Sequence, residues 1–210
     1  MACGSGNAAL AAARRCCRVV GVDDDPALLE RARRRAEAEE LEVSFLDGGT
    51  RDLPFPDGSF DVVLSACADL LVQAAEHTAA ELLRVCRPGG RIGMVVWSPG
   101  GYVGELLAAL GRQPPRWGGQ ERLRELFGPG VVAPRRSLLW RFPSARHQVD
   151  FLAGVHGPTA AALQALGPDR GGALKAGLLE LASRFDVSDD DTVALRLDYL
   201  EVVVRTPAWR

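Results

Sequence analysis

The sequence opens with MACGSGN (residues 1–7), a glycine-rich loop, and reaches CRVVGVDDD at residues 17–25. The pattern predicts a helix over residues 8–16 and a buried strand over residues 18–22. Glycines in such a loop let the backbone approach a ligand at the N-terminus of the next helix. Asp23 follows Gly6 by 17 residues, at the predicted strand tip, where its carboxylate can accept hydrogen bonds from two ribose hydroxyls. These features together favour a dinucleotide or S-adenosylmethionine as ligand.

The acidic run after this strand has a second interpretation. Asp25 precedes Pro26, an arrangement typical of a helix N-cap followed by proline in the first turn. We therefore assign Asp25 mainly to capping a helix over residues 26–39. Asp23 is assigned to the ligand, and Asp24 is kept as a candidate contact.

The rest of the chain alternates between predicted strands and helices. This alternation predicts an α/β fold: a doubly wound, mostly parallel, Rossmann-like sheet with helices on both faces. We expect one domain over residues 1–210, with a cofactor-binding half (1–98) and a substrate half (99–210). The helices between Ser144 and Phe185 are expected to form a cap over the substrate pocket, or else simply to cover one face of the sheet. The predicted strands are 42–46, 60–65, 92–97, 137–142 and 199–205, and the further helices are 74–86, 102–110, 121–127, 158–166 and 172–185.

Composition indicates a globular protein. Hydrophobic residues make up 47% of the chain and charged residues 25%. The net charge of −2 gives no indication of a nucleic-acid or membrane partner. The five cysteines show no zinc-ligand spacing, and their odd number argues against a disulfide framework. We expect a cytoplasmic protein without a bound metal.

Two further segments carry a family resemblance. LPFPDGSFDVVLS (residues 53–65) and LLRVCRPGGR (residues 82–91) resemble the class I S-adenosylmethionine-dependent methyltransferases. Within that class they are most similar to the small-molecule branch that includes ubiquinone and menaquinone biosynthesis. The resemblance is strong over the first half of the chain and loose over the second. It implies transfer of a methyl group from S-adenosyl-L-methionine to a small-molecule acceptor.

The resemblance also implies where the cofactor binds. The glycine loop would hold the methionyl part, Asp23 the ribose, the loop after residue 46 the adenine, and the end of the strand over residues 60–65 the sulfonium. Cys67 is interpreted as an inert pocket wall rather than a nucleophile. The residues assigned to the cofactor are Ala2, Cys3, Gly4, Ser5, Gly6, Asp23, Asp24, Asp47, Gly48, Gly49, Thr50, Ser65, Ala66 and Cys67.

The sequence departs from the family pattern at two places. Relatives carry Gly-Asp-Ala where this chain has Gly48-Gly49-Thr50, so the acid that accepts from the adenine amine is missing, and Asp47 is displaced by two positions. Relatives also have a strand ending in an acid just before the glycine loop, and alignment puts that acid one position before Met1. We therefore expect the first strand to be missing, the true start to lie upstream, and the chain from Met1 to be poorly stable or inactive.

No residue is clearly predicted to be catalytic. Methyl transfer is mostly a positioning problem, and a general base helps only an acceptor of high pKa. His156 and Asp69 are weak candidates for such a base, because each lies in a segment that can face the pocket. Two alternative functions stay open: a catalytically impaired binding or regulatory module, and a nicotinamide-dependent oxidoreductase. The acceptor and the oligomeric state are not encoded in any recognisable pattern.

Overall fold

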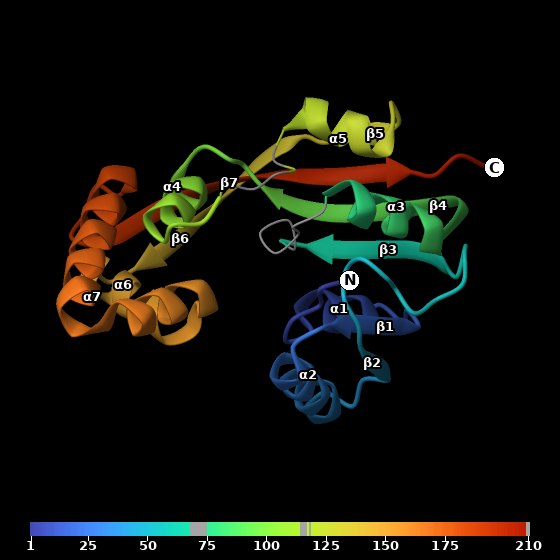
Figure 1. Cartoon of the computed structure of the whole chain (residues 1–210), viewed down its shortest axis with the longest axis horizontal. Helices are drawn as coiled ribbons and strands as arrows, with labels where there is room; N and C mark the ends of the chain where they lie inside the picture. The colour runs from blue at the N-terminus through green and yellow to red at the C-terminus, as the bar shows by residue number, and fades with distance from the viewer. Residues whose placement is uncertain (68–74, 114–116, 118, 209–210) are drawn as a thin grey trace. The chain divides into compact units, whose positions relative to one another are not determined.

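The computed structural model describes residues 1–67, 75–113, 117 and 119–208, and it divides into two compact units. The first unit comprises Met1–Val96, Gly119–Pro134 and Leu200–Arg210. The second comprises Trp97–Gly118 and Arg135–Tyr199. Figure 1 traces the chain through both units.

The first unit contains two groups of strands. β1 (Val19–Asp23) pairs in parallel with β2 (Val43–Asp47). β3 (Phe60–Ala66) pairs in parallel with β4 (Cys86–Trp97), and the order continues through β7 (Val193–Arg205) to β5 (Val131–Val132). Among the described residues, β1 and β3 belong to separate sheets and are not paired with each other. The predicted absence of the first strand therefore appears as an interruption of the sheet.

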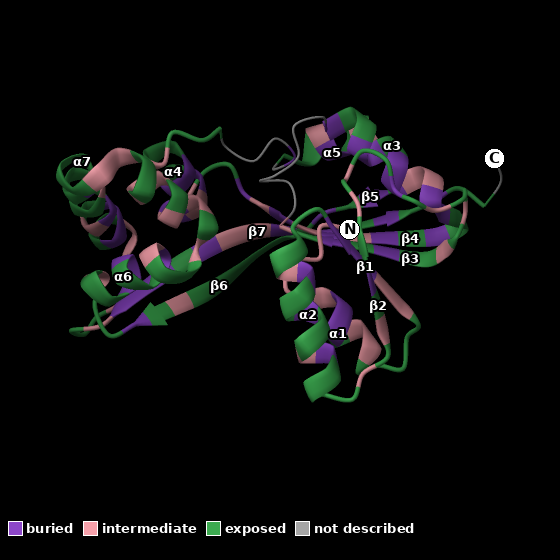
Figure 2. Ribbon diagram, turned by 60° about the horizontal axis from the view of Figure 1, so that its bottom comes forward, coloured by how far each residue is buried: buried purple, intermediate pink, exposed green. Residues whose placement is uncertain are grey.

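The helices of this unit lie on both sides of its strands, as Figure 2 shows. α1 (Asn7–Ala13) and α2 (Pro26–Ala38) pack on one side, where they share an apolar cluster with Phe45 of β2. α3 (Ala75–Val85) and α5 (Gln120–Phe127) lie on the other side. Asp25 caps α2 as predicted, because its carboxylate accepts hydrogen bonds from the N–H groups of Ala27 and Leu28.

The second unit packs three helices around its own core. These are α4 (Tyr102–Ala109), α6 (Ala145–Val155) and α7 (Gly157–Phe185). β6 (Arg135–Phe142) pairs with β7 beside them. The buried cluster includes Leu152 and Leu178, each at most 1% exposed. The capping role of these helices over a substrate pocket stays a prediction, as does the single-domain organisation.

Two segments differ from the sequence prediction, and a third agrees with it. The last strand begins at Val193 rather than at residue 199. The helix predicted over residues 74–86 ends at Val85, and β4 begins at Cys86 and runs through Pro88-Gly89-Gly90, where a loop was expected. The cause is a long-range contact: the chain after β7 bonds to this segment, with Gly89 N–H donating to Pro207 and Thr206 N–H donating to Gly90. α7 is interrupted at Gly167, whose φ of 71° is not helical, so two helices lie here as predicted.

Candidate functional site

The first unit contains a cleft of about 1510 Å³ between β1 and β3. Met1 N donates to the carbonyl of Leu64, and Cys3 N–H donates to the carbonyl of Val22, at 2.9 and 3.0 Å. The first three residues thus reach from the end of β1 to the end of β3. The cleft continues past them along both strands, from the glycine loop to Phe60.

The glycine loop forms a tight turn at one end of this cleft. Gly4 and Gly6 have φ values of +52° and +88°, a backbone region that glycine enters without strain. Gly6 N–H donates to the carbonyl of Cys3 at 2.9 Å, and α1 begins directly after it. Ala2 also has a left-handed φ of 47°, a region that alanine enters at a cost in strain. The loop therefore has the predicted form, with strain at one residue.

Asp23 ends β1 and is bound to this loop. Its Oδ2 accepts from Gly4 N–H at 2.7 Å, and its Oδ1 accepts from Asp25 N–H at 3.1 Å. The residue is only 6% exposed, yet it lines the cleft. Each carboxylate oxygen can accept more than one hydrogen bond, so the side chain still has acceptor capacity for a ligand hydroxyl.

The loop is also anchored from α2. The Arg35 guanidinium donates to the carbonyl of Ser5 and to Oδ1 of Asn7, both at 2.7 Å. It also reaches the Ser5 hydroxyl at 3.3 Å. A charge-assisted donor of this kind holds the loop backbone from the side of the helix. Arg35 was not singled out from the sequence, because it lies among several arginines on a helix with a charged face.

The predicted adenine loop begins where β2 ends. Asp47 pairs in register with Asp23, which places the two carboxyl-bearing residues side by side at the strand ends. Gly48 N–H donates to the carbonyl of Asp23 at 3.1 Å. A Cβ added to Gly48 would lie 2.9 Å from Val22, whereas one added to Gly49 would meet nothing within 4 Å. Gly48 is thus required by close packing, and Gly49 faces open space.

The sulfonium wall was predicted at the end of β3. Ser65 is buried and paired with β4, whereas Ala66 and Cys67 line the cleft. Cys67 N–H donates to the carbonyl of Val95, and its φ is +61°. Across the cleft, burial and then the charge of Asp23 raise the pKa of the Cys3 thiol, so that thiol stays protonated. The role of Cys67 as an inert wall stays a prediction.

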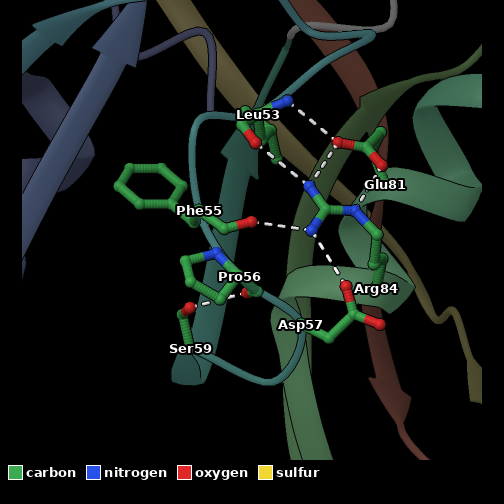
Figure 3. Close-up of polar contacts among 7 residues, drawn as sticks. All are labelled: Leu53, Phe55, Pro56, Asp57, Ser59, Glu81 and Arg84. Atoms are coloured by element: carbon green, nitrogen blue, oxygen red, sulfur yellow. Dashed lines mark hydrogen bonds and ion pairs between the residues drawn. The ribbon is translucent and has the colours of Figure 1, made fainter.

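A polar cluster fixes the segment that follows the adenine loop (Figure 3). Arg84 of α3 donates to the carboxylate of Glu81 at 2.6 and 2.8 Å, and to the carbonyls of Leu53 and Phe55 at 3.0 and 2.6 Å. Arg84 also pairs with Asp57 at 3.1 Å. Leu53 N–H in turn donates to Glu81 at 2.9 Å. Leu53 and Phe55 both line the cleft, so this cluster supports one of its walls.

The structure brings together part of the predicted site. Among the fourteen residues assigned to the cofactor, those that line the cleft are Ala2, Cys3, Gly4, Ser5, Asp23, Ala66 and Cys67. The others lie outside its lining: Gly6, Asp24, Asp47, Gly48, Gly49, Thr50 and Ser65.

Of the two candidates for a catalytic base, His156 is described by the structure and does not line this cleft. His156 belongs to the second unit, between α6 and α7, where its Nδ1 lies 2.7 Å from the Thr159 hydroxyl. Burial, and then the positive charge of Arg112, lower the pKa of His156. Asp69 lies outside the described residues. In the described part of the chain, no group of three or more His, Cys, Asp or Glu side chains could hold a metal ion.

Fold and cleft together define an α/β protein with a glycine loop and a strand-end acid, and comparison with known proteins specifies the family. A family profile described as "Methyltransferase domain" matches residues 1–94. An uncharacterised protein of Mycobacterium tuberculosis is 33% identical over 201 residues, covering 88% of this chain and 73% of that protein. The demethylmenaquinone methyltransferase of Thermus thermophilus is 43% identical over 101 residues, 47% of this chain and 46% of that enzyme.

Solved structures give the same fold. The Bacillus YcgJ protein superposes with a TM-score of 0.68 at 18% identity, covering 98% of this chain and 89% of that one. A geranyl diphosphate methyltransferase in complex with GPP and sinefungin superposes with a TM-score of 0.55 at 18% identity, covering 97% of this chain and 70% of that one.

The chain belongs to the class I S-adenosylmethionine-dependent methyltransferases. Its first half is similar to the menaquinone-biosynthesis branch, as the sequence motifs predicted. The chain is therefore an enzyme of the methyl-transfer class, and this membership decides against the oxidoreductase alternative. None of the described helices is both long and apolar enough to cross a membrane.

Proposed function

We propose that this chain binds S-adenosyl-L-methionine at the glycine-loop end of the cleft and transfers its methyl group to a small-molecule acceptor. The observation that carries the proposal is the joining of Asp23 to the glycine loop through Gly4 N–H at 2.7 Å. This contact places a carboxylate and a flexible loop backbone at one end of the cleft. A ribose and an amino-acid tail are the two groups that such a pair can recognise.

The residues present fit this cofactor at the ribose and at the methionyl part. Asp23 is held in place by two backbone donors and keeps acceptor capacity toward the cleft. The backbone at Gly4 lies open, since a Cβ there would meet nothing within 4 Å. The fit is weaker at the adenine, where Gly49 leaves open space in place of an acid. Asp47 pairs in register with Asp23, and it is the described carboxylate that can substitute for the missing acid.

When bound, the cofactor supplies an electrophilic methyl group on a sulfonium. The contribution of the protein is then to hold that group in line with the acceptor and to exclude water. We assign Ala66 and Cys67 to the wall beside the sulfonium, because both line the cleft at the end of β3. An acceptor of low pKa needs no base; His156 and Asp69 remain the proposed candidates for one of high pKa.

The binding assignment is tested by titrating the protein with S-adenosylhomocysteine. Asp23→Ala removes a carboxylate that accepts two backbone N–H bonds, and it should weaken binding at least tenfold, because each charge-assisted bond to the ribose contributes about 1.5–3 kcal/mol. The matched control is Asp25→Ala, which also removes a carboxylate that accepts two backbone N–H bonds. The control should lower the melting temperature through loss of the helix cap and leave affinity unchanged. Equal affinities for the Asp23 variant and the unsubstituted protein would refute the assignment.

A catalytically impaired binding module is the second candidate function. The open space at Gly49 favours it, because a carboxylate partner for the adenine amine is missing from that position. Binding of S-adenosylhomocysteine without methyl transfer to any of a panel of phenols, quinols and amines would support this alternative. Transfer to any of them would exclude it.

A further inference from the structure

One wall of the cleft is held by Glu81 and Arg84, which do not themselves line the cleft. Glu81 and Arg84 lie one turn apart on α3, and both face the segment from Leu53 to Asp57 (Figure 3). Their side chains are 12% and 28% exposed, so the ion pair is largely shielded from water. Such pairs are stronger and more directional than ion pairs on open surface.

The cluster fastens backbone rather than side chains. Leu53 is held at both of its backbone polar groups: its N–H donates to Glu81 and its carbonyl accepts from Arg84. The carbonyl of Phe55 accepts from the same guanidinium at 2.6 Å. A guanidinium is suited to this task, because its planar set of donors can serve two carbonyls and two carboxylates at once.

The held segment connects directly to the proposed adenine loop. Gly48 is fixed at the other end of that loop by its bond to the carbonyl of Asp23 and by its packing against Val22. Residues 49–52 therefore lie between two fixed points, Gly48 and Leu53. A loop of four residues between fixed ends has little freedom, so its shape depends on both attachments.

We propose that Glu81 and Arg84 are positioning residues that set the shape of the adenine loop through Leu53, and so control cofactor affinity from outside the cleft. The inference rests on the proposed function, since it concerns the affinity of the same site. The inference gives a role to Glu81 and Arg84 of α3, whereas the family resemblance alone assigns them none.

The decisive variants are Arg84→Met and the double variant Glu81→Met/Arg84→Met. Arg84→Met leaves a shielded carboxylate without its charged partner, so it should lower both the melting temperature and the affinity for S-adenosylhomocysteine. The double variant removes both charges and should recover the part of the melting temperature that Arg84→Met loses through the unpaired carboxylate. It should still bind S-adenosylhomocysteine at least fivefold more weakly than the unsubstituted protein, because Leu53 remains unfastened. Recovery of both quantities would show that the pair is only structural and would overturn the proposal.

A neighbouring ion pair provides the matched control. Arg87 donates to Asp61 at 2.6 Å, like Arg84 to Glu81, but these side chains are 53% and 81% exposed, and within the described residues neither holds loop backbone. Arg87→Met should change neither affinity nor melting temperature measurably.

Amide hydrogen exchange separates this inference from the proposed function. In protein without ligand, Arg84→Met and the double variant should accelerate exchange at residues 49–53 at least tenfold, and Arg87→Met should not. If the unsubstituted protein fails to bind S-adenosylhomocysteine, the proposed function falls, and the exchange rates alone decide the positioning role. Unchanged exchange at residues 49–53 would overturn the inference whatever the binding result.

Discussion

A strand fused ahead of Met1 should stabilise the first unit. β1 and β3 each present an unpaired edge to the cleft within the described structure, and Met1 and Cys3 already bond to the ends of these edges. The added segment would be five residues, four of them apolar, such as Val-Leu-Asp-Val-Ala, placed to continue the backbone from Met1 along the cleft. Burial already lowers the pKa of the Met1 amino group, and the fusion replaces this ammonium by a neutral amide.

The expected stabilisation is estimated from the contacts that a strand would make in the cleft between β1 and β3. A five-residue strand with two neighbours forms about eight further ladder bonds, each contributing about 1 kcal/mol net. Val62 and Leu64, which are 51% and 41% exposed, would contribute about 1 kcal/mol each when covered. Ordering five residues costs about 7 kcal/mol. The balance is about 3 kcal/mol before the burial of the new side chains, which raises the melting temperature by about 6–12 °C.

The assay is a thermal melt of the fused and unfused proteins, with and without S-adenosylhomocysteine. A fusion of five Gly and Ser residues controls for chain length, since it adds backbone with low strand preference and no apolar surface. Equal melting temperatures for the apolar and Gly-Ser fusions would refute the reasoning, because the cleft would then not accept a strand. A larger ligand-induced shift in the apolar fusion would link the strand to the site as well.

Three further outcomes are expected. The Gly49→Asp variant should fold normally, because the added side chain enters open space and the backbone φ at this position is not left-handed. It should bind S-adenosylhomocysteine more tightly than the inosyl analogue of that ligand. Equal affinity for the two ligands would show that the aspartate does not meet the adenine amine. Ala2→Gly should raise the melting temperature by about 2–4 °C by relieving a φ of 47°, and a lower melting temperature would contradict the strain at this position. The Arg84 guanidinium above all holds the pKa of Glu81 below its usual value, so this carboxylate stabilises the fold above pH of about 4.3, and its contribution is lost as pH falls through the folded-state pKa. In urea unfolding, the stability difference between the unsubstituted protein and Glu81→Gln should accordingly shrink from pH 7 to pH 3, and a constant difference would argue against a depressed pKa.

Local patterns predicted the elements of this chain well. Short apolar runs indicated β1 and β3, the order of strands and helices indicated β2, and the Asp25-Pro26 pair identified the start of α2. The interruption of the sheet was also predicted, because the family pattern requires a strand before the glycine loop. These features depend on neighbours in sequence or on a known motif.

Long-range contacts account for what the sequence did not reveal. Arg84 reaches Leu53 across 31 positions, and Arg35 reaches Ser5 across 30, so neither partner can be inferred from periodicity. The early start of β4 depends likewise on pairing with the chain after Thr206. An arginine on a helix has the same appearance in sequence whether it is solvated or holds a loop.

The positions of the cysteines around the cleft allow ligand binding to be followed by chemical labelling of the protein's own thiols. Cys3, Cys16, Cys17 and Cys67 line the cleft, whereas the side chain of Cys86 is fully buried. Alkylation of the folded protein should therefore modify the exposed Cys16 and Cys17 first. Cys3 and Cys67 should react more slowly because they are partly buried, and Cys3 also because burial raises the pKa of its thiol. Cys86 should react only when the chain unfolds. Intact-mass spectrometry can then rank candidate acceptors and cofactor analogues by how far each slows labelling of Cys3 and Cys67. Such a screen needs no knowledge of the methyl acceptor, and modification of Cys86 marks compounds that merely denature the protein.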